Sequence, residues 1–226
     1  MLSIPALAGV VLLSFAFSDV AVARCSDDRE PGVDWSGCQK IRKMLDDENF
    51  TGADFSEANL SRSTLDESDL TGAKLIKTDL TRVSMRDVVL LRTDLSRAVG
   101  YRADLRGSSI TTSLFAKSEF SRADFSGSRI DSVDMSKSEL GRARFEGATL
   151  DDVQFVYSNL SRAVFLKATL NSVDFAGAYT YLTRFEGVDL RKVRRLTQAQ
   201  VDLACGDEKT QLPTELRRPR HWPCNE

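Results

Sequence analysis

Large apolar residues recur at every fifth position from Phe50 to Leu190. Of these 29 positions, 27 carry Leu, Phe, Ile or Met, and only Gly100 and Thr180 depart from the pattern. A second series, two residues earlier in each unit, contains only Ala, Ser, Thr or Val. A period of five fits neither a helix, at about 3.6, nor a strand, at about 2. The pattern therefore indicates a repeat architecture in which the chain turns a corner every five residues.

Individual units share a recognisable wording. Residues 53–57 read Ala-Asp-Phe-Ser-Glu, residues 58–62 Ala-Asn-Leu-Ser-Arg, residues 103–107 Ala-Asp-Leu-Arg-Gly and residues 123–127 Ala-Asp-Phe-Ser-Gly. This resembles the pentapeptide repeat family, consensus A(D/N)LXX, over residues 50–193. The resemblance implies an all-β fold, a right-handed quadrilateral β-helix with 20 residues per coil. About seven coils follow, so at ~4.8 Å between strands the rod would be about 34 Å long.

The period of 20 places particular side chains on one face. Both defects of the large series fall on the same face, and Phe120, one coil after Gly100, is expected to fill the volume that the glycine leaves. Another face is expected to stack a run of aromatic rings toward the C-terminal end: Leu65, Met85, Leu105, Phe125, Phe145, Phe165 and Phe185.

Residues 1–23 are predicted to be a signal peptide. An apolar run from Ile4 to Phe17 is followed by Ala21-Val22-Ala23, a small-x-small cleavage site before Arg24. The start carries no Lys or Arg, so a retained membrane anchor is the alternative, although the run is short for a span. The residues before Cys25 do not resemble a lipobox. We expect a periplasmic or secreted protein with no stable membrane insertion after cleavage.

The four cysteines fit this export. Cys25 and Cys38 flank a short N-terminal loop, and Cys205 and Cys224 flank a C-terminal one. An even number in an exported chain predicts two local disulfides, although four cysteines allow three connectivities. A zinc site is the alternative, but the spacings do not match and only His221 could join the thiols.

The sequence predicts a cap at each end of the β-helix, because an open strand edge invites aggregation. Residues 24–49 form the N-terminal cap, residues 50–193 the β-helix, and residues 194–226 a C-terminal helix and Pro-rich tail. Trp35 is expected to cover the first coil. Thr197 and Gln200 form a capping box for a helix over 197–205. Residues 33–38 and the tail resemble exported bacterial pentapeptide proteins of an alphaproteobacterial group.

The last two predicted coils carry apolar residues at outward positions. We expect the tail to cover this patch, with Trp222 packed on the tyrosines; an open partner-binding or dimer surface is the alternative. The patch contains Val156, Tyr157, Val164, Leu166, Tyr179, Tyr181 and Leu182.

No residues point to catalysis, a cofactor or a metal. The chain has one histidine, and it has no Gly-rich phosphate loop or metal-ligand spacing. A net charge of −2, or −1 without residues 1–23, argues neither for nucleic acid nor for a membrane surface. Some members of the resembled family mimic DNA and protect gyrase, but that role requires a strongly acidic cytoplasmic rod.

One pattern exceeds the consensus. Arginines spaced by 20 residues are expected to stack along one corner, here called the arginine ladder, with four more cations one face earlier. The ladder is Arg62, Arg82, Arg102, Arg122, Arg142 and Arg162, and the second series is Lys77, Arg97, Lys117 and Lys137. Nearby carboxylates offer counter-charge in the simpler interpretation, a solvated surface: Asp79, Asp104, Glu119, Asp124 and Glu139.

We therefore expect a rigid scaffold or protein-interaction module without catalytic activity. The alternative is a polyanion-binding surface on the arginine ladder, for a glycan or an acidic protein. A DNA-mimic gyrase modulator and an enzyme are disfavoured. The partner would be an unknown protein or an anionic polymer, and not nucleic acid.

Overall fold

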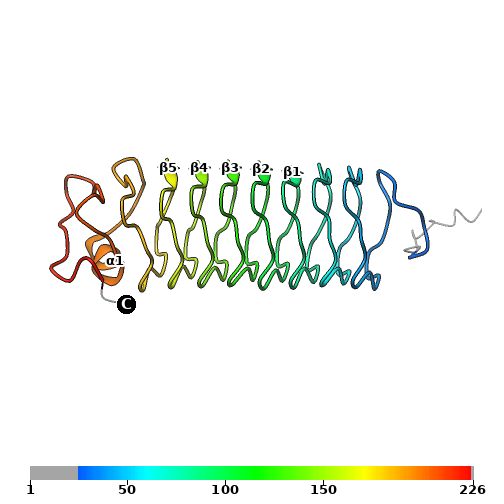
Figure 1. Ribbon diagram of the computed structural model, residues 1–226, viewed down its shortest axis with the longest axis horizontal. Coiled ribbons are helices and arrows are strands. Elements are labelled where there is room, and N and C mark those ends of the chain that lie inside the picture. The colour runs from blue at the N-terminus through cyan, green and yellow to red at the C-terminus, as the bar shows by residue number, and fades with distance from the viewer. Residues whose placement is uncertain (1–24, 225–226) are drawn as a thin grey trace, which may run out of the picture.

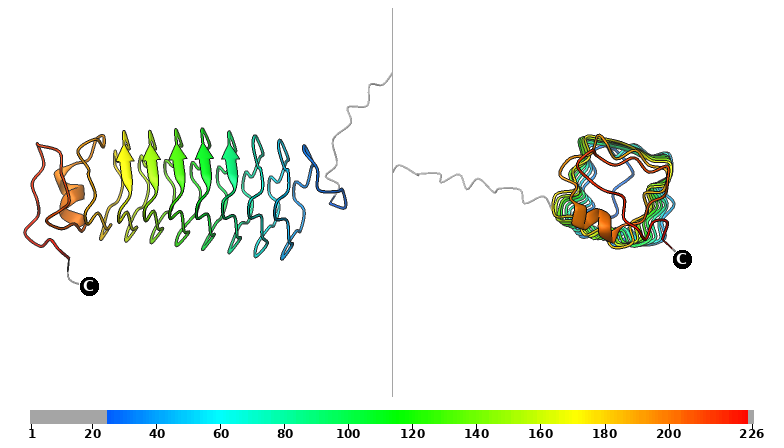
Figure 2. Two further views of the ribbon diagram at one scale, coloured as in Figure 1. Left: turned by 45° about the horizontal axis from the view of Figure 1, so that its top comes forward. Right: turned by 90° about the vertical axis from the view of Figure 1, so that its left-hand side faces the viewer.

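The structure, a computed structural model, describes residues 25–224. They form a rod of stacked coils with a square cross-section (Figures 1 and 2). The predicted all-β quadrilateral β-helix is thus confirmed. The predicted signal peptide and its cleavage site lie outside the described residues. No helix of residues 25–224 is long and apolar enough to cross a membrane.

The coils pair in parallel with a constant step of 20 residues. Along one edge the pairing is regular enough to form a five-stranded sheet in sequence order, with Leu90 opposite Ile110 and Ile110 opposite Ile130 (Figure 1). Its strands are β1 (Val89–Leu91), β2 (Ser109–Thr111), β3 (Arg129–Asp131), β4 (Thr149–Asp151) and β5 (Thr169–Asn171). Elsewhere the coils pair through single bridges with the same step.

The predicted inward series form the core. Every member of the large series from residue 50 to residue 190 is buried. Buried hydroxyls of the small series bond backward, as when Thr78 Oγ1 donates to the Phe55 carbonyl at 2.7 Å. The predicted aromatic stack is present, with ring centroids 5.0 Å apart for Phe125–Phe145 and 4.8 Å for Phe145–Phe165. Two apolar or satisfied side chains per five residues therefore hold each coil to the next.

Both departures from the large series have a structural reason. A Cβ on Gly100 would lie 2.2 Å from Phe120 Cε1, so the ring occupies the missing volume as predicted. Thr180 lies where the terminal helix meets the coils, and its hydroxyl donates to the Gln200 carbonyl at 2.8 Å. The Gln200 side chain in turn donates to the Phe175 carbonyl at 2.6 Å. The polar core position thus receives the cap.

The N-terminal boundary at residue 50 and the count of about seven coils are wrong. Bridges along one face run in eight steps of 20 residues from Asp34 to Arg194, so residues 31–50 form a further coil. Trp35 is buried against Phe50 and Phe55, with ring centroids 5.7 Å away in each case. Trp35 therefore caps the apolar core from within this first coil.

The C-terminal cap contains α1 (Gln198–Leu203), with the predicted capping box between Thr197 and Gln200. Both predicted disulfides are present, Cys25–Cys38 and Cys205–Cys224. Beyond α1 the chain continues the pairing, because Cys205 bridges to Arg184 and Gln211 to Asp189. The exposed strand edge at this end is thereby covered.

The predicted docking of Trp222 on the tyrosines is wrong. Its indole Nε1 donates to the Ala204 carbonyl at 2.7 Å, and its ring covers Gly206, where a Cβ would lie 2.3 Å from the ring. Tyr179 and Tyr181 remain 50% and 42% exposed. The tail packs on the end of the rod and leaves the tyrosine surface open.

Candidate anion-binding edge

The arginine ladder stands on one corner of the rod. Each of its six arginines occupies the second position of a turn, with φ between 57° and 62°. Its amide donates to the turn of the next coil; Arg122 N, for example, lies 2.9 Å from the Gly141 carbonyl. These stacked turns place consecutive guanidinium stems one coil apart, ~4.8 Å in a parallel sheet. All six residues are exposed.

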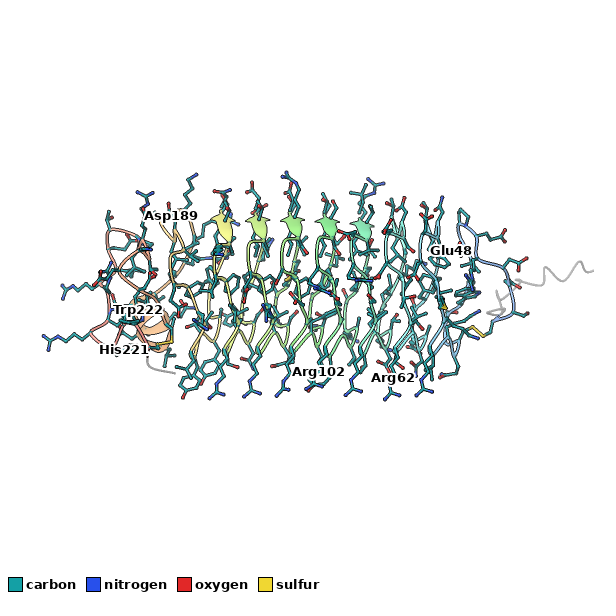
Figure 3. All side chains as sticks on the ribbon, viewed as in Figure 1. Glu48, Arg62, Arg102, Asp189, His221 and Trp222 are labelled. Carbon is teal, nitrogen blue, oxygen red and sulfur yellow. A yellow bond between two sulfur atoms is a disulfide. The ribbon has the colours of Figure 1, made fainter. Side chains whose placement is uncertain are left out.

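Figure 3 shows Arg62 and Arg102 on the same edge, with both side chains directed away from the rod. The structure also extends the ladder by one coil that sequence analysis missed. Arg42 has the same turn conformation, with φ of 55°, and its amide donates to the Ser61 carbonyl at 3.1 Å. The spacing of 20 was the available signal, but the first coil had been assigned to the cap.

The ladder ends where the C-terminal cap begins. Leu182 takes the next turn position, with φ of 53°, and its amide donates to the Leu203 carbonyl at the end of α1. An apolar side chain suits this site because it is half-buried beside the cap. The ladder thus covers the open length of the corner.

No ladder arginine of residues 42–162 forms a side-chain hydrogen bond or ion pair with another described residue. Other cations of the rod do have carboxylate partners: Arg86 pairs with Asp66, Arg106 with Asp104 at 2.6 Å, and Arg194 with Asp152 at 2.6 Å. Pairing is therefore common on this rod, and the ladder is an exception to it.

The carboxylates expected to neutralise the ladder are engaged elsewhere. Asp104 accepts from Arg106, and although partial burial tends to raise its pKa, the bonds from Arg106 hold that pKa below the usual range. Asp124 lies 3.7 Å from Arg144, and Glu139 accepts from Asn159 at 2.8 Å. The counter-charge in the simpler interpretation is thus largely taken by other groups.

The second cation series behaves differently along its length. Lys77 pairs with Glu57 at 2.7 Å. Within the described chain, Arg97, Lys117 and Lys137 form no ion pair, and all three are exposed. This series borders the same face as the ladder, since one face separates consecutive turns. The face between residues 97 and 142 therefore has unpaired cations on both of its edges.

This arrangement is electrostatically unfavourable without a partner. Two unit charges at the coil spacing of ~4.8 Å repel by about 1 kcal/mol in water, and salt weakens the effect. A bound polyanion would replace repulsion by attraction at every rung. The geometry is that of a linear anion-binding surface, with one guanidinium per coil.

Tyrosines interrupt the turn positions that precede the arginines. Arg102 and Arg122 lie over the Tyr101 ring, with the guanidinium carbons 5.3 and 6.0 Å from its centroid. Further along the same corner, Tyr179 and Tyr181 stack with centroids 6.2 Å apart and an interplanar angle of 12°. Aromatic rings therefore stand near both ends of the C-terminal half of the ladder.

Between these rings lies a shallow groove of about 510 Å³. Small turn residues form its floor and guanidinium groups form its rim. Its lining is Ser121, Arg122, Gly141, Arg142, Asn159, Ser161, Arg162, Tyr179 and Tyr181.

The described residues offer no competing chemical centre. They contain no group of His, Cys, Asp and Glu side chains that could hold a metal ion. Both cysteine pairs are oxidised, and His221 lies in the cap beside the Ala204 carbonyl, next to Trp222 (Figure 3). The zinc alternative is therefore wrong.

The repeat matches known protein families. A family profile described as pentapeptide repeats matches residues 49–87 and 148–179, and a second profile of that description matches residues 115–159. The chain belongs to the pentapeptide repeat family. No curated protein matches this pentapeptide repeat protein significantly.

Solved structures show the same fold. Full-length QnrB1, a plasmid-mediated fluoroquinolone resistance protein, is 19% identical with a TM-score of 0.59, covering 75% of this chain and 92% of its own. HetL, involved in heterocyst differentiation regulation in the cyanobacterium Nostoc sp. strain PCC 7120, is 19% identical with a TM-score of 0.48, covering 82% and 87%.

Proposed function

We propose that this pentapeptide repeat protein is an exported, non-catalytic binding scaffold whose arginine ladder holds an extended polyanion. One observation carries the proposal: the ladder arginines lack carboxylate partners, whereas other cations of the same rod have them. A rod with stacked turns keeps such charges in line without a large ordering cost on binding.

Two features support a location outside the cytoplasm. Both cysteine pairs form disulfides, which persist mainly in oxidising compartments. The apolar N-terminal segment has the composition of a signal peptide. Polymers that carry regularly spaced carboxylate, phosphate or sulfate groups are the ligand class that a line of guanidiniums would recognise.

The test removes charge from the ladder without touching the core. A variant with Arg82, Arg102, Arg122 and Arg142 changed to Gln should fold normally and elute from heparin at clearly lower salt than the wild type, because polyanion contacts depend on counterion release.

A matched control changes four arginines that already pair with carboxylates, namely Arg86, Arg106, Arg144 and Arg191. It removes the same formal charge and should elute closer to the wild type. Equal elution of all three proteins would refute polyanion binding and leave a protein scaffold as the function.

A protein-interaction role remains the second candidate, and the exposed tyrosines favour it. Tyr157 is 68% exposed and lies across Gly177, where a Cβ would be 2.5 Å from its ring. Exposed aromatic residues of this kind are enriched at protein interfaces. A DNA-mimic role fits less well, because an edge of unpaired arginines is opposite in charge to the DNA backbone.

A further inference from the structure

We propose that the groove between Tyr101 and Tyr181 binds an acidic polysaccharide, with a sugar ring packed on the Tyr179–Tyr181 pair and acidic groups on the ladder. This inference rests on the proposed polyanion-binding function and names the class of ligand. The two ends are four coils apart, about 19 Å at ~4.8 Å per coil.

The groove floor is open because of side-chain size and not because of backbone demand. Gly141 has no left-handed φ, and a Cβ there would meet its nearest neighbour, Ser161 Oγ, at 3.4 Å. A larger residue is therefore sterically permitted, as Tyr101 and Tyr181 show at the same turn position of other coils. The glycine leaves space above the floor that the fold does not need.

The lining groups match a sugar better than a bare charge. Hydroxyl groups of Ser121 and Ser161 and the amide of Asn159 face the groove with the guanidiniums of the rim. Such groups can hydrogen-bond sugar hydroxyls, while the C–H face of a pyranose packs on an exposed aromatic ring. A partly stacked tyrosine pair at the end of the ladder supplies that ring surface.

Other polyanions fit less well. Nucleic-acid-binding domains are typically strongly basic, whereas this chain has a net charge of −2 and a pI near 5.6. A folded acidic protein would need a broader contact surface with an apolar centre. The groove is narrow, polar and as long as several coils, which suits a single extended polymer.

The experiment compares three probes of equal charge number: an oligogalacturonate, a polyglutamate and a single-stranded oligonucleotide. The full mature chain should bind the oligogalacturonate at least about tenfold more tightly than the polyglutamate, the order of effect that an aromatic stacking contact produces.

Two variants separate shape from charge. Gly141→Tyr fills the floor, and a double change of Tyr179 and Tyr181 to Ala removes the aromatic pair. Each should abolish the preference for the oligogalacturonate and leave polyglutamate binding within about threefold of wild type. The control is Thr71→Tyr, a turn residue on the diagonally opposite corner, where the next coil carries Leu91. It should change nothing.

The outcomes distinguish the two proposals. Equal binding of the oligogalacturonate and the polyglutamate, unaffected by either variant, would overturn the polysaccharide inference and leave polyanion binding intact. Tighter binding of the oligonucleotide would assign the groove to nucleic acid and overturn the inference as well. Absence of binding to every probe would remove both proposals.

Discussion

The contact between Gly100 and Phe120 gives a sharp test of the core register. Replacing Gly100 with Ala should destabilise the protein, because the new Cβ would lie 2.2 Å from Phe120 Cε1. The ring cannot move freely, since it is fully buried and packs on Phe115 and Phe125 with centroids 5.2 and 6.0 Å away. Overpacking of this kind reduces stability by about 1–3 kcal/mol.

A second change should relieve the clash. Phe120→Leu alone leaves a cavity and should destabilise by about 1–2 kcal/mol. Combined with Gly100→Ala, it should give a loss smaller than the sum of the two by about 1 kcal/mol or more, because the added methyl partly fills the space that the ring leaves.

Urea unfolding of the four proteins, followed by far-ultraviolet circular dichroism, measures this coupling. Gly141→Ala is the matched control: its Cβ has no close neighbour and its φ is ordinary, so it should be neutral or stabilising by up to about 1 kcal/mol. If Gly100→Ala proves as stable as Gly141→Ala, or if the double variant shows simple additivity, the assigned packing is wrong.

Two further predictions concern the caps and the charges. Changing Cys205 and Cys224 to Ser opens a loop with a sequence separation of 19 and should lower stability by about 3 kcal/mol, measured by thermal unfolding against the untreated protein; an unchanged midpoint would contradict a stabilising cap. Stability should be level above about pH 5 and fall as the pH drops toward 2, because carboxyls with depressed pKa values bind protons more readily when unfolded. Bonds from Arg191 lower the pKa of Asp189 to about 2, and bonds from Arg195 outweigh burial to lower that of Asp174, so a flat acid profile would refute this.

Much of the fold followed from the sequence because the repeat has one dominant physical signal. Each inward position is either large and apolar or small, and this holds for 27 of 29 large positions. A constant period then fixes which side chains stack, so the Phe125–Phe185 stack and the partner of Gly100 could be predicted. Local signals also sufficed for the capping box and for both disulfides, whose cysteines are close in sequence.

The first coil escaped prediction because its inward positions are not apolar. Lys40 stands in the large series, with its Nζ 3.4 Å from the Trp35 ring centroid and bonded to the Cys25 carbonyl at 2.7 Å. The hydroxyl of Ser63 satisfies the backbone above it, accepting from Lys43 N at 2.9 Å. Such replacements depend on contacts from neighbouring segments, which a single-sequence pattern does not contain.

The candidate site was predicted in outline and missed in detail. The spacing of 20 located the ladder, but the absence of ion pairs depends on which carboxylates neighbouring arginines such as Arg106 and Arg144 engage. The tail was misplaced for a similar reason. Trp222 could pack on any apolar surface within reach, and its partner, Gly206, carries no side chain that would mark it in the sequence.

The left-handed turns of the ladder set stability against surface charge. A side chain with a Cβ is disfavoured at positive φ by about 1 kcal/mol, and another corner of the rod uses glycine at the equivalent positions, Gly107, Gly127 and Gly147. Arginine at such a turn is thus a poorer choice for folding than glycine. Selection for a stable rod alone would erode the ladder, so its unbroken run from Arg42 to Arg162 is the pattern expected where charge itself is maintained.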